Sequence, residues 1–198
     1  MDITNYQKLK DLFWEANRAF IEKDLDLLYE DISERCLCGA LMHELNKQLE
    51  KNDCNNYYAD VEFNRNKKEI KQLHNDDGFV SNILPDIIVH SRGKEILDNL
   101  LVLEMKKSSA DHQDKENDRN RLRKMTKQNY NGNSYSYEYR LGIYYEINFE
   151  KKQILVEFYQ DGENVEDKIL SYEDTTKRSG KAIEYNRRIQ HLVAAYCR

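Results

Sequence analysis

The sequence has one proline, Pro85, and only seven glycines among its 198 residues. It has no stretch rich in proline, glycine or serine, and no internal repeat or low-complexity tract that would separate two domains. A chain of this length is sufficient for one domain with its own hydrophobic core. We therefore predict a single domain over residues 1–198, with an N-terminal helical extension at 1–30, a core at 31–160 and a helical C-terminal region at 161–198.

Long apolar runs are also absent, since no stretch approaches the roughly 20 residues that a membrane-spanning helix needs. The N-terminal segment MDITNYQKLKDLFWE carries charges throughout and lacks the apolar core of a signal peptide. The four cysteines are Cys36, Cys38, Cys54 and Cys197. Because their spacing gives no C-x-x-C pair of the kind found in zinc sites, we interpret them as free thiols. These absences predict a cytoplasmic protein that does not contact membranes.

Several catalytic motifs with well-defined spacing are missing. The sequence contains no G-x-S-x-G nucleophile elbow, no phosphate-binding G-x-x-x-x-G-K and no dinucleotide-binding G-x-G-x-x-G. Its five histidines are scattered and form no H-E-x-x-H zinc motif. The net charge of -5 and the pI near 5.6 exclude a generic polyanion binder, so contacts with nucleic acid would need local basic patches.

Hydrophobic periodicity is present along the chain, together with 14 tyrosines and 6 phenylalanines that argue against disorder. Helical spacing predicts helices at 5–23, in a second region that ends near residue 51, at 112–129 and at 177–196. Alternation and short apolar runs predict strands at 57–64, 83–90, 99–106, 139–148 and 152–160. Because helix 112–129 lies between strands, we predict an α/β (α+β) fold with a mixed β-sheet flanked by helices.

The stretch PDIIVHSRGKEILDNLLVLEMKK, residues 85–107, places acids inside an apolar strand pattern. If its two strands form an antiparallel hairpin centred on residue 95, Asp86 lies opposite Glu104 with β-carbons about 5 Å apart. Glu104 and Lys106 share a face because side chains alternate along a strand. The spacing therefore predicts that two carboxylates and one ammonium group converge at one end of the sheet.

Two interpretations of this convergence remain open. Neighbouring carboxylates in an apolar setting repel each other, and a hard cation such as Mg²⁺, which prefers oxygen ligands, removes the repulsion. A metal ion with a nearby lysine suits the attack of water on a phosphodiester. The alternative is a partly buried Asp–Lys–Glu salt-bridge cluster that only stabilises the hairpin.

Glu34 is a third candidate acid at the start of the second helical region. At helical spacing it falls on the apolar stripe that includes Cys38 and Leu41, which is an unusual position for a carboxylate. The alternative is a variant capping box, Asp31-Ile-Ser-Glu34, in which the Glu34 side chain reaches back to the start of the helix. The residues alone leave both interpretations open.

Basic side chains cluster in the segment 64–71 and along the charged helix 112–129. Such stripes beside a carboxylate site can bind a phosphate backbone. The candidate nucleic-acid-binding residues are Arg65, Lys107, Arg119, Arg123 and Lys127. The alternative for each of them is an ordinary solvated face.

The motif Pro85-Asp86, followed after a loop by Glu104-Met105-Lys106, resembles that of the PD-(D/E)xK nuclease superfamily with the restriction-endonuclease-like fold. The motif is short, and the order of elements around it over residues 31–148 adds weight to the resemblance. The resemblance implies a core of order αβββαβ, to which this chain adds an N-terminal helix, a strand and a C-terminal helix.

The same resemblance implies roles for individual residues. Asp86, Glu104 and the main-chain carbonyl of Met105 would bind Mg²⁺, for which Mn²⁺ substitutes, and Lys106 would position the attacking water. Some branches, including archaeal Holliday-junction resolvases, add a glutamate from the first core helix, and Glu34 matches that place. The Q-x-x-x-Y motif of the RecB-type branch is not matched, since Gln128 is followed by a tyrosine at 130 rather than 132.

We therefore expect a Mg²⁺-dependent DNA endonuclease that serves in restriction, phage defence or repair. The alternatives are a non-catalytic module of the same fold that binds nucleic acid or protein, and an endonuclease that cuts RNA. Small nucleases of this fold often act as dimers, so a homodimer or a partner subunit is compatible with the resemblance. The resemblance reveals neither the recognition sequence nor an interface.

Overall fold

A computed structural model describes residues 5–63, 65–66, 69–70, 72–74, 80–82, 84–128 and 137–173, and of these it describes the side chains of 5–63, 84–128 and 137–173. The predicted helix at 177–196 lies outside the described residues, as does the side chain of Arg65.

Four helices are described, and three of them begin at a capping side chain. They are α1 (Tyr6–Lys23), α2 (Leu25–Tyr29), α3 (Glu34–Lys51) and α4 (His112–Thr126). Asn5, Ser33 and Asp111 precede α1, α3 and α4, and each accepts a hydrogen bond from a main-chain N–H of the first turn. None of the described helices is long and apolar enough to cross a membrane.

Six strands form the main sheet, in the order β1-β6-β7-β8-β9-β10. They are β1 (Tyr58–Val61), β6 (Ile87–His90), β7 (Asn99–Lys107), β8 (Leu141–Asn148), β9 (Gln153–Gln160) and β10 (Glu163–Ser171). All neighbours are antiparallel except β7 and β8, which run parallel and are connected through α4. Between β1 and β6 in the sequence, the chain forms two small two-stranded hairpins. One pairs β2 (Arg65–Asn66) with β3 (Glu69–Ile70), and the other pairs β4 (Gln72–His74) with β5 (Val80–Asn82).

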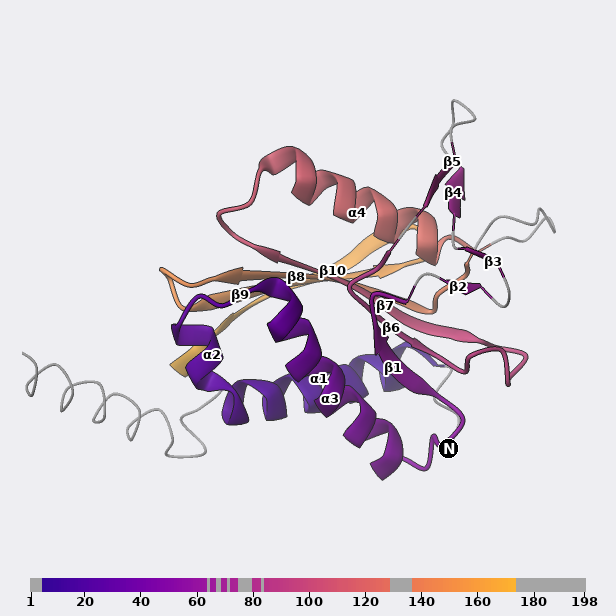
Figure 1. Ribbon diagram of the computed structural model, residues 1–198, viewed down its shortest axis with the longest axis horizontal. Coiled ribbons are helices and arrows are strands. Elements are labelled where there is room, and N and C mark those ends of the chain that lie inside the picture. Colours follow the sequence, from indigo (N-terminus) through magenta and orange to yellow (C-terminus); the bar gives the residue numbers. More distant parts are fainter. Residues whose placement is uncertain are drawn as a thin grey trace, which may run out of the picture.

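The sheet is covered on both faces (Figure 1). Helix α4 lies on one face, and α1 to α3 lie on the other. Because side chains alternate along β7, Leu101, Leu103 and Met105 belong to the core beneath α1 and α3, whereas Val102 belongs to a second core beneath α4. The hydrophobic side chains of Leu122 and Met125 fix α4 on this second core. Any polar side chain of β7 on the face of Val102 must therefore contact α4.

The observed architecture confirms the predicted mixed sheet flanked by helices, with the predicted strands recovered at shifted ends. The prediction of a helical C-terminal region from residue 161 is wrong for residues 163–171, which form β10. A two-residue turn, Asp161-Gly162, connects β9 to β10, and both of its residues have positive φ (49° and 83°). Asp-Gly is a preferred sequence for such hairpin turns, but the charged, exposed residues of β10 lack the alternation by which strands are recognised.

Candidate metal and phosphodiester site

The predicted register of the β6–β7 hairpin is found in the structure. Ile87 pairs with Leu103, Ile88 with Val102 and Val89 with Leu101, which is the register of a hairpin centred on residue 95. The strand β6 begins one residue after Asp86, whereas β7 continues to Lys107. This difference in length leaves one edge of β7 without a strand partner at the position where the candidate residues lie.

Two carboxylates occupy this edge of β7. Asp86 Oδ2 accepts a hydrogen bond of 2.7 Å from Met105 N, and Glu34 Oε1 accepts one of 2.8 Å from Lys107 N. On the other side, Ser108 N donates to Ile147 O of β8, so N–H groups of odd-numbered residues face away from β8. The Met105 carbonyl points to the same edge as its N–H. The two carboxylates therefore take the place of the missing strand.

Glu34 does not cap its own helix, so the capping-box interpretation is wrong. Ser33 is the N-cap of α3 and accepts from Cys36 N, while the Glu34 carboxylate reaches the backbone of β7. Glu34 is the first residue of α3 and lies on the same helix face as Cys38. Cys38 packs against Met105 of β7, and their sulfur atoms are 3.6 Å apart. The helix face that covers the sheet thus places Glu34 at the end of β7.

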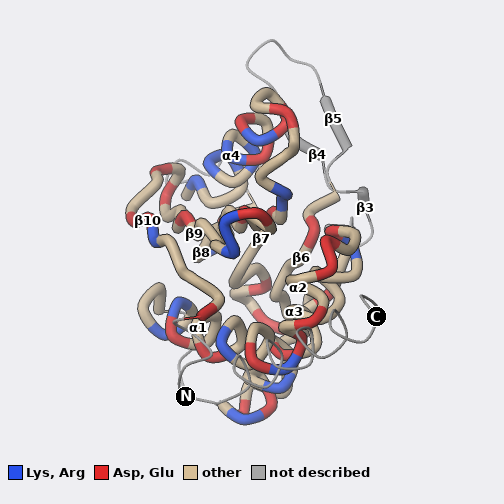
Figure 2. The backbone as a smooth tube through the Cα atoms, turned by 90° about the vertical axis from the view of Figure 1, so that its left-hand side faces the viewer, with Lys and Arg blue, Asp and Glu red and all other residues tan. Residues whose placement is uncertain are grey.

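On the α4 face of β7, Glu104 and Lys106 meet an aspartate and an arginine of the helix. Arg121 Nε donates to Glu104 Oε1 at 3.0 Å, and Arg121 is also ion-paired with Asp118. Lys106 Nζ lies 3.0 Å from Asp118 Oδ2. Glu104, Arg121, Asp118 and Lys106 therefore form a continuous chain of alternating charges between β7 and α4; Figure 2 shows charged segments of both signs along α4.

Burial dominates the electrostatics of the two predicted metal-binding acids. It raises the pKa of Asp86 to about 6, although the Met105 N–H and Lys106 act in the opposite direction. It raises the pKa of Glu104 to about 8, against the attraction of Arg121 and with the repulsion of Asp86. For Lys106, burial lowers the pKa, but the hydrogen bond and charge of Asp118 outweigh it and the net pKa is raised. At pH 7 Asp86 is therefore mostly ionised, whereas the pKa of Glu104 lies above neutral pH.

The donor chemistry of this site fits a hard divalent cation. Mg²⁺ is usually bound by one or two carboxylates and retains several waters, and Asp86 and Glu104 supply two carboxylates. No group of three or more His, Cys, Asp or Glu side chains within the described part of the chain is arranged to bind a metal. The Glu34 carboxylate accepts from Lys107 N just as Asp86 accepts from Met105 N, so this contact does not separate the two acids as ligands.

The candidate nucleic-acid-binding residues lie at the end of β7 and along α4. Lys107 Nζ pairs with Asp31 at 2.8 Å. Arg123 donates to Asn120 and lies over the ring of Tyr159. Lys127 follows the end of α4 and packs beside Gly162, where an added β-carbon would lie 2.9 Å from Lys127 Cδ.

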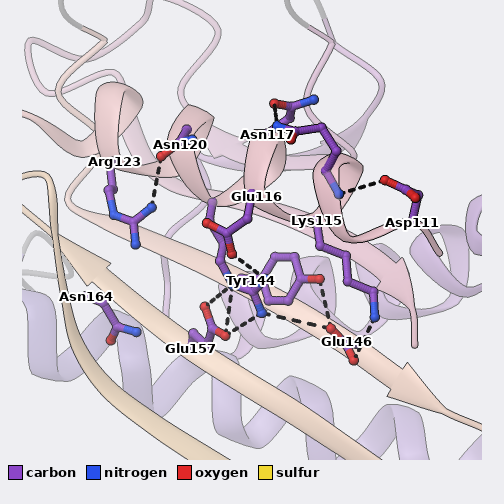
Figure 3. Close-up of polar contacts among 12 residues, drawn as sticks. Asp111, Lys115, Glu116, Asn117, Asn120, Arg123, Tyr144, Glu146, Glu157 and Asn164 are labelled. Carbon is purple, nitrogen blue, oxygen red and sulfur yellow. Dashed lines mark hydrogen bonds and ion pairs between the residues drawn. The ribbon is translucent and has the colours of Figure 1, made fainter. Parts of the chain in front are cut away.

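Arg119 is held in a separate cluster on α4, β8 and β9. Its Nε donates to both carboxylate oxygens of Glu157, at 3.1 and 2.9 Å, and its Nη2 donates to Oε1 at 2.7 Å. Its Nη1 donates to Glu116 at 3.1 Å. The guanidinium carbon lies 4.0 Å from the ring centre of Tyr144. Figure 3 shows Glu116 reaching from the helix toward Tyr144, Glu146 and Glu157 on the strands. Two acids and an aromatic ring therefore hold the Arg119 guanidinium within the protein.

Asp118 and Arg121 are the site residues that sequence reasoning missed. A signal was available for Asp118, because it precedes Leu122 by four residues and Met125 by seven, and all three are buried on one face of α4. No comparable signal exists for Arg121, whose partner Glu104 lies on a strand that α4 approaches only in the folded chain. A comparison of the chain with protein-family models, curated proteins and solved structures finds no match, so the residues and their geometry carry the functional argument.

Proposed function

We propose that this protein is a metal-dependent nuclease that hydrolyses phosphodiester bonds of DNA. The observation that carries the proposal is the arrangement at the start of β6, where Asp86 accepts a hydrogen bond from Met105 N of β7 while Glu104 and Lys106 lie on the adjoining face. The pattern of residues also resembles the PD-(D/E)xK motif. The raised pKa values of Asp86 and Glu104 support the proposal, because perturbed carboxylates are frequent at functional sites.

Each residue has a defined part in this reaction. Asp86 and Glu104 would hold Mg²⁺, which would supply Lewis-acid chemistry at the phosphodiester. Lys106, charged because of Asp118, holds a water by hydrogen bonding and orients it for in-line attack. Its side chain is 20% exposed, so Lys106 is not enclosed in the core.

Calorimetric titration with Mn²⁺ and a plasmid-nicking assay test the proposal together. The wild-type protein is expected to bind Mn²⁺ and to nick DNA with Mg²⁺ or Mn²⁺. Asp86→Asn should abolish both Mn²⁺ binding and nicking. Lys106→Ala should reduce the nicking rate by about 100-fold or more and still bind the metal. Lys94→Ala is a matched control, because Lys94 lies in the β6–β7 loop at the opposite end of the hairpin and donates to Tyr58. Nicking that persists in both site variants would contradict the assignment.

A second candidate is a non-catalytic module that binds nucleic acid or protein. The observation that favours it is the chain of ion pairs from Glu104 through Arg121 and Asp118 to Lys106, which neutralises the cluster without a metal. This candidate predicts no heat of Mn²⁺ binding and binding of nucleic acid without cleavage.

Parallel digests of DNA and RNA separate the DNA endonuclease from an RNA endonuclease.

A further inference from the structure

Arg121 is the cationic partner of Glu104 in the structure, and it contacts that carboxylate through a single hydrogen bond. Only Nε donates to Glu104, through one hydrogen bond of 3.0 Å, and the terminal nitrogen Nη2 is directed to Asp118. A bidentate arginine–carboxylate pair, which is the stronger geometry, is not formed with either acid. The side chain is also 32% exposed. Arg121 can therefore leave Glu104 and keep its contact with Asp118.

Arg119, two residues earlier on the same helix, shows what a fully held arginine looks like in this fold. Two of its nitrogens donate to Glu157, a third pairs with Glu116, and its guanidinium lies over the ring of Tyr144. Its side chain is only 15% exposed. Helix α4 thus carries one arginine that is fixed by a bidentate pair and one that spans two acids by single contacts. The second arginine lies beside the candidate metal ligand Glu104.

We propose that Arg121 is an internal counter-ion that a divalent cation displaces from Glu104, so that Arg121 sets the metal affinity of the site. This inference rests on the proposed function, since it assumes that Glu104 binds the metal. Without metal, Arg121 donates to the buried carboxyl group of Glu104 and favours its ionised form. When a divalent cation binds Glu104, Arg121 pairs with Asp118 alone, and the metal affinity is reduced by the free energy needed to break the Arg121–Glu104 contact. Arg121 is a positioning residue in this scheme.

The test is calorimetric titration of Mn²⁺ into the wild type, Arg121→Gln and Arg121→Lys, with melting temperatures measured in chelator and in Mn²⁺. We expect Arg121→Gln to bind Mn²⁺ about tenfold more tightly than the wild type, within the usual range of coupling between competing ligands. Its melting temperature in chelator should fall, and its rise on adding Mn²⁺ should exceed that of the wild type. A purely structural arginine would lower the melting temperature without tightening metal binding.

Two further variants make the result decisive. Arg121→Lys keeps the charge but cannot bridge both acids, so its Mn²⁺ affinity should lie between those of the wild type and Arg121→Gln; it decides the matter if Arg121→Gln does not fold. Lys115→Gln removes the same charge from the same helix, but its ammonium pairs with Glu146, so Mn²⁺ affinity should change by less than about twofold.

The outcomes separate the two proposals. If neither the wild type nor the Arg121 variants bind Mn²⁺, the proposed function and this inference are both wrong. If the wild type binds Mn²⁺ and the Arg121 variants bind no more tightly, only the role of Arg121 is wrong. Equal tightening in Lys115→Gln would show that net charge, rather than displacement of Arg121, governs the affinity.

Discussion

Arg119 and Arg121 are two residues apart on α4, and the clusters around them differ in how their charges are balanced. Arg119 is enclosed by acids on β8, β9 and its own helix, and it forms a bidentate pair with Glu157. Arg121 is shared between Glu104 on β7 and Asp118, and Glu104 retains a pKa raised to about 8. Since buried charge pairs stabilise a fold only with near-complete hydrogen bonding, the first cluster is suited to structure and the second to exchange of partners.

The largest expected effect is on stability when Arg119 is removed. Arg119→Met leaves the buried carboxylate of Glu157 without its guanidinium, and we expect a loss of about 3–5 kcal/mol in the free energy of unfolding. Arg121→Gln should cost only about 1–2 kcal/mol, because it removes single hydrogen bonds. Urea unfolding in the presence of chelator measures both.

A double variant provides the control for this comparison. Arg119→Met combined with Glu157→Gln removes the charge that Arg119 balances, and it should recover part of the stability lost in the single variant. If Arg119→Met and Arg121→Gln cost the same free energy, the distinction between a fixed and a displaceable arginine would be wrong.

The second prediction concerns pH and applies to the metal-free protein. The pKa values of Asp86 and Glu104 are raised by burial in the folded state, so the folded chain binds these protons more tightly than the unfolded chain. Their contribution to stability is complete below about pH 4 and is lost as the pH rises through about 6 and then about 8. Unfolding free energies at about pH 5 and about pH 8, measured in chelator, should therefore differ by a few kcal/mol in favour of the lower pH.

Two variants attribute this pH dependence to the site. Glu104→Gln cannot ionise, so it should flatten the decline between about pH 5 and about pH 8. Glu163→Gln, an exposed position at the start of β10, should leave the decline unchanged. A decline that is equally steep in Glu104→Gln would mean that other groups cause it, and that Arg121 neutralises Glu104 more fully than the geometry indicates.

Some contacts of the site could be predicted from the sequence, and others depend on tertiary packing. The pairing of Asp86 with the end of β7 follows from strand alternation and from a loop centred on residue 95, which are both local properties. The partners of Glu104 and Lys106 depend on where α4 crosses the sheet, and the sequence of α4 is charged on most of its surface. A charge run of this kind does not reveal that Arg119 faces β9 while Arg121 faces β7, since tertiary packing decides it.

The smallest expected effects come from two tyrosines that donate to the acids around Arg119. Tyr144 donates to Glu146 at 3.0 Å, and Tyr159 donates to Glu157 at 2.7 Å. Tyr144→Phe and Tyr159→Phe keep the rings and remove one hydrogen bond each, so each should cost about 1 kcal/mol in urea unfolding. Tyr159→Phe should cost more, because it leaves an oxygen of the buried Glu157 with one donor fewer, whereas Glu146 keeps Lys115. Neither change touches Glu104, so Mn²⁺ affinity should be unaltered; a change in that affinity would show that the two clusters are coupled through α4 rather than independent.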